Sequence, residues 1–382
     1  MDFWEFRRLE FERRDSRLKN AKPMRLKKTS NKKNRLHIVY VMTWTGLCGG
    51  SKIILQHCNE LIRRGHKVSI VCHFPKPGWF PLDERVNFIQ VPFGDVLCES
   101  ILPCDVIVAT YWKEIYECVE QNSAPVVYFE QGDTHLFEPN SMDIRTMQHI
   151  RKQLNIAPFV YTVSTFAKEK LLENFNVEAA VIPNAIDKKI FYPDITKIAS
   201  DKKTVITAIG SEHIGFKYIA NIIVAVTLLK KLGNNIEFIW ISPDEPSKFT
   251  TIPALVRPSQ EKIGECLRRS DIYVCASLYE SFCLPVLEAM TCGAAVVTTD
   301  NGGIRDFVEN NMNALIIKKN NIADMMEKIE MLINDIELRY SLSSAAAKTA
   351  QTFDWTHTTD KLIDYYQDIA SYSCQNEHLT QC

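Results

Sequence analysis

The chain has 382 residues, of which 46% are apolar and 24% are charged, and its net charge is −1. This composition is ordinary for a globular protein, the length allows two domains with separate cores, and the charge gives no overall bias toward nucleic acid or membranes. No stretch of about 18 apolar residues predicts a membrane-spanning helix, and no apolar N-terminal segment predicts a secretory signal. The twelve cysteines form no C-x-x-C pair, so we expect buried reduced thiols in a cytoplasmic protein.

Residues 1–35 form a basic N-terminal extension, with thirteen Lys or Arg residues against five Asp or Glu residues. We expect this extension to be solvated and poorly ordered. The alternative is a peripheral contact of residues 1–33 with anionic lipid at the inner membrane face, because basic and aromatic side chains together bind such surfaces.

The first domain is expected over residues 36–187 and opens with a strand at 37–41. Gly49 and Gly50 follow, then apolar residues recur at helical spacing up to Gly65, and the next strand covers 67–72. This is a β-loop-α-β opening of the doubly wound type, without the G-x-G-x-x-G fingerprint of dinucleotide-binding proteins. Gly49 and Gly50 either let the backbone approach a ligand at the helix start or simply form a tight turn.

Two further buried strands are predicted at 105–110 and 125–130, and His135 follows the second of them. A histidine just past the carboxyl end of a strand is well placed for acceptor binding or proton relay, although a structural role is equally compatible with the sequence. A strand at 159–163 and a helix capped by Ser164 complete the predicted domain.

Residues 188–203 are polar and contain proline, which is typical of a linker, and the second domain is expected over 204–352. Its first strand ends at Gly210, and Lys217 precedes an amphipathic helix. A strand follows at 236–242. Lysine at a helix start is either solvated or placed to neutralise an anionic ligand.

Residues 271–297 predict a strand, a loop, a short helix and a second strand. Pro285 fits the first turn of that helix and Gly293 its end. Glu280 then lies in the loop and Glu288 about one turn inside the helix, so both carboxylates can face one pocket at the carboxyl end of a parallel sheet. Carboxylates accept hydrogen bonds from sugar hydroxyls, and free N–H groups near Leu284 can receive a diphosphate.

The segment from Glu280 to Glu288 resembles the E-x7-E signature of family 4 (group 1) glycosyltransferases, which are retaining enzymes of the GT-B fold. Residues 181–193, with Asn184, and the turn at Gly302 and Gly303 resemble further segments of that family. The resemblance covers about residues 36–370 and implies two Rossmann-like doubly wound α/β domains facing across a cleft. It also implies that residues 353–372 form a C-terminal helix that crosses back to the first domain.

The resemblance also assigns roles to residues. Glu288 would bind the donor ribose, Glu280 would contact the donor sugar, and Lys217 would offset the diphosphate charge. The catalytic candidates are therefore Glu280, Lys217 and His135. Of these, His135 would lie on the acceptor side. The other donor-binding candidates are Gly210, Ser211, Arg257, Ser281, Phe282, Cys283, Leu284 and Pro285, and the acceptor or cleft candidates are Gly49, Gly50 and Asn184. No metal is expected, and no cofactor other than the nucleotide sugar.

By this resemblance the protein is a hexosyltransferase-type enzyme. It would move a sugar from a UDP-, GDP- or dTDP-sugar to a hydroxyl of a carbohydrate, lipid-linked or small-molecule acceptor, with retention, in polysaccharide or glycoconjugate synthesis. Several positions depart from the family pattern; among them Ser211 replaces an arginine, and Ser281 and Cys283 replace glycines. These departures keep open a catalytically weak binding or structural protein, and a sugar-nucleotide epimerase would share the same donor site.

Overall fold

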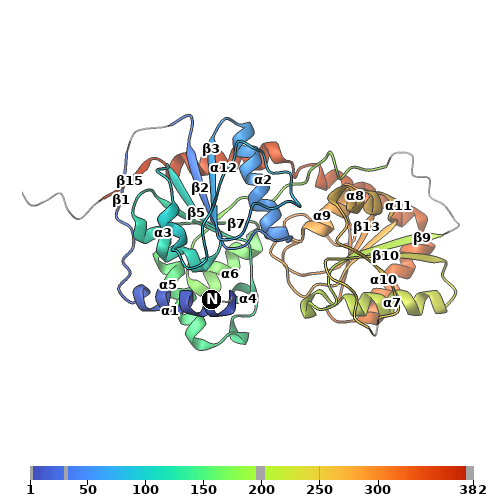
Figure 1. The fold of residues 1–382 in the computed structure, drawn as a ribbon. Coiled ribbons are helices and arrows are strands. Elements are labelled where there is room, and N and C mark those ends of the chain that lie inside the picture. The colour runs from blue at the N-terminus through green and yellow to red at the C-terminus, as the bar shows by residue number, and fades with distance from the viewer. Residues whose placement is uncertain (1–2, 30–32, 195–202, 249, 376–382) are drawn as a thin grey trace, which may run out of the picture. The chain divides into compact units, whose positions relative to one another are not determined.

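The computed structural model describes residues 3–29, 33–194, 203–248 and 250–375, which form two compact units (Figure 1). The first unit comprises Met1–Pro183 and Thr356–Cys382, and the second comprises Asn184–Trp355. Half of the predicted linker, residues 195–202, lies outside the described residues. No helix in the described part of the chain combines the length and the apolar character needed to cross a bilayer.

The first unit is built on a seven-stranded parallel sheet. In spatial order its strands are β4 (Asn87–Gln90), β3 (Lys67–Cys72), β2 (His37–Met42), β5 (Val106–Ala109), β6 (Val126–Glu130), β7 (Phe159–Thr162) and β8 (Ala180–Val181). Within this sheet the chain first forms the central strand β2, then β3 and β4 toward one edge, and then β5 to β8 toward the other edge. The carboxyl ends of β2 and β5 therefore form a topological switch point, where doubly wound sheets bind ligands.

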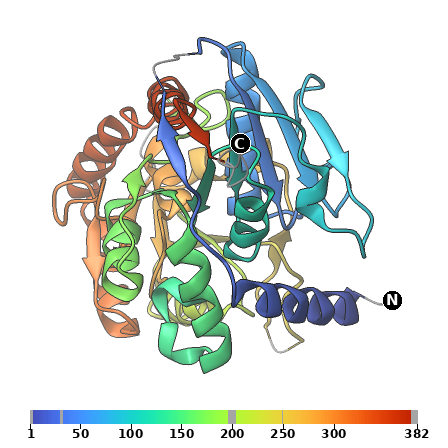
Figure 2. The ribbon, with the colours of Figure 1, turned by 90° about the vertical axis from the view of Figure 1, so that its left-hand side faces the viewer.

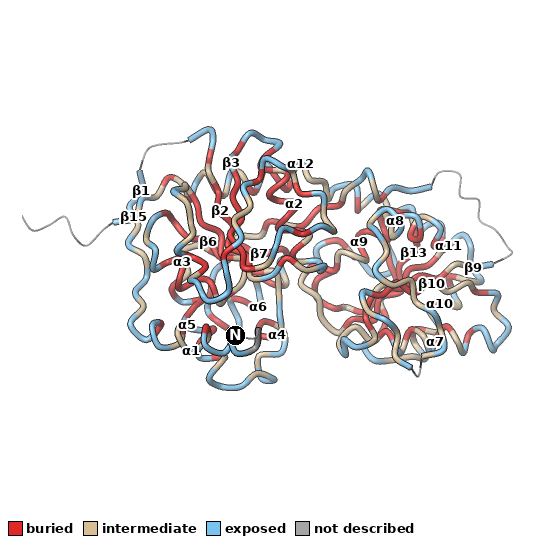
Figure 3. The backbone as a smooth tube through the Cα atoms, viewed as in Figure 1, coloured by how far each residue is buried: buried red, intermediate tan, exposed pale blue. Residues whose placement is uncertain are grey.

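Helices cover both faces of this sheet, as the alternation of side chains along β2 requires. Val39 and Val41 point into a core shared with α3 (Ile115–Gln121), α5 (Ile144–Ile156) and α6 (Thr165–Phe175). On the opposite face lie α2 (Gly49–Arg63) and α12 (Trp355–Ile369), where the Tyr366 hydroxyl is 3.0 Å from that of Tyr40 and 2.9 Å from that of Tyr161. The central strands are buried along almost their whole length, as Figure 3 shows in red.

The second unit repeats the plan with six parallel strands. Their order is β11 (Ala254–Val256), β10 (Ile236–Ser242), β9 (Thr204–Ile209), β12 (Ile272–Cys275), β13 (Ala295–Thr299) and β14 (Leu315–Ile317). α7 (Ile219–Lys231) and α10 (Ile322–Asn334) pack on one face, while α8 (Gln260–Arg269), α9 (Leu284–Thr291) and α11 (Ile336–Ala350) pack on the other. The prediction of two Rossmann-like α/β folds is therefore confirmed.

Short helical turns connect these elements. They are η1 (Leu97–Ser100), η2 (Trp112–Glu114), α4 (Thr134–Phe137), η3 (Pro139–Ser141) and η4 (Gly215–Lys217). Two of them, α4 and η4, follow strands at the carboxyl edges of the sheets and carry His135 and Lys217. The loops and turns at these edges thus hold the candidate residues, while the strands fix where the loops begin.

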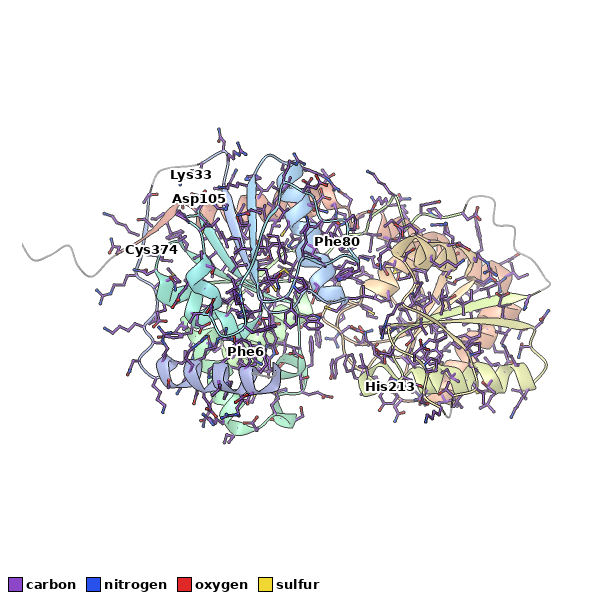
Figure 4. All side chains as sticks on the ribbon, in the orientation of Figure 1. Phe6, Lys33, Phe80, Asp105, His213 and Cys374 are labelled. Carbon is purple, nitrogen blue, oxygen red and sulfur yellow. The ribbon has the colours of Figure 1, made fainter. Side chains whose placement is uncertain are left out.

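The expectation of a poorly ordered N-terminal extension is wrong for residues 3–29. Residues Phe3–Leu18 form α1, which packs against α3 and α5, and β1 (Leu26–Lys28) pairs antiparallel with β15 (Tyr372–Cys374), side by side in Figure 2. Lys33, the first residue described after position 29, forms an ion pair with Asp105 just before β5 (Figure 4). The extension is held by charge pairing with later parts of the chain, which its own sequence does not reveal.

Candidate functional site

In the second unit, β9 and β12 are parallel neighbours at the point where the strand order reverses. The loop after β9 runs from Gly210 into η4 and carries Lys217, and the loop after β12 carries Glu280. Because the carboxyl ends of parallel strands meet at one edge of a sheet, the topology brings these two loops together.

Lys217 and Glu280, 63 residues apart, form an ion pair in which Lys217 Nζ donates to Glu280 Oε1. Their side chains are 21% and 15% exposed. Burial lowers the pKa of Lys217, but the Glu280 charge outweighs this and holds the pKa above its ordinary value. Phe216 stacks on Tyr279 with ring centroids 4.5 Å apart, which ties the two loops together. The pair is a fixed cation and anion at the switch point.

The loop that follows β13 supports Glu280 from below. The Glu280 backbone N–H donates to the carbonyl oxygen of Asn301 over 2.9 Å, and Glu280 pairs with Gly302 in an isolated bridge. A Cβ atom at Gly303 would lie 2.7 Å from both the Glu280 oxygen and the Phe282 nitrogen. Glycines at 302 and 303 therefore allow the backbone of this loop to lie directly against the backbone of the Glu280 loop, in addition to forming a turn.

Glu288 lies on α9 and is 6% exposed. Tyr273, on β12, has a pKa above its ordinary value. Burial raises this pKa most strongly, and nearby thiols and the charges of Glu288 and Glu280 add to the increase. The structure pairs Lys217 with Glu280 and places Glu288 on the helix that follows the Glu280 loop.

The start of α9 differs from a glycine-rich loop. Cys283 has a φ of +58°, a left-handed conformation that favours glycine. Its buried thiol lies 3.8 Å from that of Cys275 on β12, so the side chain is packed rather than solvent-exposed. Phe282 is also buried, Leu284 begins α9 and Pro285 occupies its first turn, while Ser281 is half-buried.

The remaining donor-side candidates lie on neighbouring strands. Ser211 is buried, and its hydroxyl accepts a hydrogen bond from the His213 backbone N–H over 3.1 Å. Gly210 accepts from Trp240 Nε1 over 2.9 Å. Arg257 follows the edge strand β11, is exposed, and donates from Nε to the Pro243 oxygen over 2.7 Å. Three strand spacings, about 14 Å, separate β11 from β12, so only an extended ligand would contact both Arg257 and Glu280.

The first unit has a cavity of about 370 Å³ at the carboxyl ends of β2, β5 and β6. Its lining includes Trp44, Phe74, Tyr111, Glu130, Asp133 and the first turn of α2. Of the acceptor candidates, Gly50 lines this cavity and the adjacent Gly49 begins α2, whose first turn contains no acidic residue. Asn184 is the first residue of the second unit and is buried.

His135 lies behind Glu130 and is not among the residues that line this cavity. The ring is 1% exposed, and its Nε2 is 2.8 Å from Glu130 Oε2. Burial lowers the pKa of His135, but the Glu130 charge more than compensates and raises it. Glu130 also accepts hydrogen bonds from the Tyr128 hydroxyl over 2.8 Å and the Gly132 N–H over 2.6 Å. Sequence reasoning missed Glu130, although its place at the end of an apolar strand was a usable signal.

Arg7 is a second residue that sequence reasoning missed. Its side chain lines the same cavity although it belongs to α1, within the N-terminal extension. Nothing in the local sequence distinguishes it from the neighbouring arginines. No group of three His, Cys, Asp or Glu side chains suited to a metal ion occurs within the described ranges.

Comparison with known proteins relates this architecture to one enzyme class. Residues 254–349, which contain Glu280 and Glu288, match the model of "Glycosyl transferases group 1". The phosphatidylinositol N-acetylglucosaminyltransferase GPI3 subunit of Saccharomyces cerevisiae is 25% identical over 379 residues, covering 86% of this chain and 82% of the relative. D-inositol 3-phosphate glycosyltransferase of Rhodococcus erythropolis is 27% identical over 38% of this chain and 30% of its own length.

Solved structures show the same fold. Sucrose-phosphate synthase from Thermosynechococcus elongatus matches with a TM-score of 0.72 at 14% identity, over 87% of this chain and 98% of its own. Anabaena HepE, solved in complex with UDP and glucose, matches with a TM-score of 0.71 at 14% identity, over 86% and 99%. The GT-B fold predicted from the sequence is thereby confirmed.

Proposed function

Since the chain is a glycosyltransferase of group 1, of the hexosyltransferase type expected from its sequence, we propose that it transfers a hexosyl group from a UDP-sugar to an acceptor hydroxyl with retention of anomeric configuration. The observation that carries this proposal is the Lys217–Glu280 pair at the switch point of the second unit, with the buried Glu288 on the adjacent helix. Each of the three charges matches one part of a nucleotide sugar.

The diphosphate is the part whose charge grows during transfer, because it leaves as a nucleoside diphosphate. A preorganised cation beside it stabilises the transition state more than the bound donor. Lys217 is such a cation, held in place by Glu280 and kept protonated by its raised pKa. The N–H groups at the start of α9 add a partial positive charge. Ser211 adds no charge where the family has arginine, so Lys217 carries most of the electrostatic load.

The two carboxylates serve the sugar rings. Glu288 is buried one turn into α9, where it can accept hydrogen bonds from the vicinal ribose hydroxyls. Glu280 lies in the loop before it, where the transferred hexose would follow the diphosphate. Glu280 then exchanges part of its bond with Lys217 for bonds to hexose hydroxyls, which leaves the ammonium to the phosphates.

The donor and acceptor classes follow from related proteins. HepE was solved with UDP and with UDP-glucose, and the names of several relatives specify N-acetylhexosamine transfer or inositol-containing acceptors. We therefore propose UDP-glucose or a UDP-N-acetylhexosamine as donor and a sugar or polyol hydroxyl as acceptor, in glycoconjugate synthesis. The first-unit cavity, beside Gly50 and Glu130, is the proposed acceptor site, with the buried His135 holding Glu130 in position.

Peripheral contact with anionic membranes remains part of the proposal, but it depends on fewer basic residues than residues 1–33 contain. Arg13, Arg14 and Arg17 form ion pairs with acidic residues of α3 and its C-terminal turn. On α1, Arg8 and Arg17 are also exposed, but each is paired with an acid. Further exposed lysines and arginines lie after α1 and include Lys19, Lys22, Arg25 and Lys27. These later side chains would face lipid.

The test compares nucleotide binding and transfer in four proteins: the full-length chain, Glu288→Gln, Lys217→Met and the control Glu327→Gln, an exposed acid on α10. Calorimetry with UDP, UDP-glucose, UDP-N-acetylglucosamine and GDP-mannose measures affinity, and NMR of the anomeric proton in the product measures stereochemistry. We expect Glu288→Gln to weaken UDP binding by about tenfold, as for one lost charge-assisted hydrogen bond. Lys217→Met should reduce turnover by about 100-fold or more. Unchanged UDP affinity in both variants, or an inverted anomeric proton, would contradict the proposal.

A further inference from the structure

The first-unit cavity receives a cation from outside its own sheet. Its lining comes mainly from the loops after β2, β3, β5 and β6 and from α2, but it also includes Arg7 of α1. Glycosyl acceptors are recognised in a cavity of this kind through polar groups at fixed positions. A guanidinium in that position favours an anionic partner with two acceptor oxygens, such as a carboxylate or a phosphate.

Contacts of α1 with the rest of the domain fix the position of Arg7, so its guanidinium can bind an anion. Its Nη1 donates to Glu10 Oε2 over 2.9 Å, and the other oxygen of Glu10 lies 3.1 Å from Arg14 Nη2. Arg14 is itself 2.8 Å from Glu117 on α3, so the helix that carries Arg7 is bound to the domain. One face of α1 also packs its Phe6 ring 5.2 Å from that of His73. The Arg7 side chain keeps 20% of its surface exposed at the cavity.

The acids of the cavity already have partners. Glu130 is bound by His135, Tyr128 and Gly132. Asp133 accepts the Tyr111 hydroxyl over 2.9 Å and caps α4 through the Thr134 N–H over 2.7 Å. Arg7 forms its ion pair with Glu10 on its own helix.

A second cation adds to the positive charge at this edge. Lys113 follows Tyr111 in the chain, and its Nζ is 5.6 Å from the centre of the Tyr111 ring. Burial lowers the pKa of Lys113 most, the charges of Arg7 and Arg14 lower it further, and the charges of Glu114 and Glu10 partly offset this decrease. Within the part of the chain that the structure describes, no carboxylate forms an ion pair with Lys113. Lys113 does not line the cavity, but its charge would add to the attraction that Arg7 exerts on an anion bound there.

We propose that the first-unit cavity binds an acceptor that carries a phosphate ester, and that Arg7 is the residue that binds the phosphate. This inference rests on the proposed function in that it takes the cavity as the acceptor site. The aromatic rings of Trp44, Phe74 and Tyr111 pack against the ring of the sugar or polyol. The N-terminal helix is then an acceptor-specificity element of the enzyme. The phosphate ester has two possible sources, a free sugar or polyol phosphate and a phospholipid headgroup.

The experiment measures discrimination between matched anionic and neutral compounds in the full chain. Myo-inositol 1-phosphate and glucose 6-phosphate are compared with myo-inositol and glucose by calorimetry, and vesicles of phosphatidylcholine with and without phosphatidylinositol are compared by flotation. We expect the phosphate esters, the phosphatidylinositol vesicles or both to bind at least about tenfold better than the neutral partners, as for a bidentate arginine contact. The compounds that do so identify the source.

Three variants assign the effect to Arg7. Arg7→Gln should abolish the preference and leave binding of the neutral compounds unchanged. Arg8→Gln is the matched control, because it removes a neighbouring charge whose side chain is 60% exposed and pairs with Glu12. Arg7→Lys retains the charge without the planar fork and should keep part of the preference. Arg7→Lys also keeps the test decisive if Arg7→Gln does not fold. If Arg7→Lys and Arg8→Gln both retain the full preference for phosphate esters, the role of the guanidinium is overturned.

The result is separable from the donor-site proposal. Lys217→Met, in the second unit, should leave the preference for phosphate esters intact. If UDP binds and sugar is transferred but anionic and neutral acceptors bind alike, or if Arg7→Gln retains the preference, this inference fails while the proposed function stands. If UDP does not bind, the proposed function fails whatever the acceptor result.

Discussion

The backbone of Gly303 lies so close to Glu280 that a Cβ atom there would sit 2.7 Å from the Glu280 carbonyl oxygen. Gly303→Ala must therefore move the loop that carries Glu280, because that contact is to backbone and not to a flexible side chain. We expect a loss of about 1–3 kcal/mol in stability, as for other overpacked sites, and a loss of UDP-sugar binding. The measurements are thermal denaturation and calorimetry. Gly78→Ala is the control, since nothing lies within 4 Å of a Cβ at Gly78; equal effects of the two changes would refute the close-contact explanation.

The pair of His135 and Glu130 predicts a pH-dependent contribution to stability. The pKa of His135 is raised, so its contribution is complete below its ordinary pKa of 6.5 and disappears as the pH rises through the folded-state pKa. The pKa of Glu130 is lowered despite burial, mainly by the His135 charge, so its contribution is complete above 4.5 and disappears as the pH falls through the folded-state pKa. The pair should stabilise the fold most between pH 4.5 and 6.5.

The measurement is urea denaturation of the wild type and His135→Gln across that range and up to pH 9. The stability difference between the two should be largest near pH 6 and should shrink at alkaline pH. His357→Gln, at an exposed position on α12, should give a difference that does not follow this profile. A difference for His135→Gln that grows toward pH 9 would mean that the ring is neutral in the folded protein.

Strands and the acidic loop were predictable because their signals are local. β12 and β13 are buried on both faces, so they appear in the sequence as continuous apolar runs. The segment Glu280–Glu288 carries its chemistry and its helix-start proline within a few residues. The reversal of strand order that places Lys217 beside Glu280 is typical of the doubly wound fold, which the alternation of strands and helices predicts.

The packing of the N-terminal helix was not predictable for the opposite reason. The buried face of α1 includes Glu10 and Arg14, 4% and 1% exposed, so the sequence lacks the apolar stripe that indicates a packed helix. The acids that make its burial possible lie about a hundred residues later, on α3 and just before it. Gly303 was predictable as a turn, but its contact with Glu280 depends on a pairing between two separate loops.

Arg14 should be among the most sensitive positions of the first unit. Burial opposes its charge, but Glu114, Glu117 and Glu10 together raise its pKa above the ordinary value. Arg14→Met leaves these buried carboxylates without their shared cation, and we expect a loss of about 3–5 kcal/mol. Hydrogen exchange followed by mass spectrometry should show reduced protection in α1, α3 and α5. Arg8→Met, which breaks only an exposed pair with Glu12, should change stability by about 0.5 kcal/mol or less. Similar losses in the two variants would show that the α1 network contributes little.

The last prediction separates the two roles of Glu280. Glu280 forms an ion pair with the Lys217 ammonium, so it competes with the phosphates of a nucleotide for the same cation. Glu280→Gln removes this competing charge and should tighten binding of UDP by about three- to tenfold, the range of a partly exposed charge pair. It should nevertheless reduce transfer from a UDP-sugar, because the carboxylate that accepts the hexose hydroxyls is lost. Lys217→Met should weaken UDP binding and transfer together. Calorimetry at two salt concentrations and a transfer assay distinguish these outcomes: the gain for Glu280→Gln should be smaller at high salt. Weaker UDP binding in Glu280→Gln would show that Glu280 positions Lys217 for the phosphates and does not compete with them.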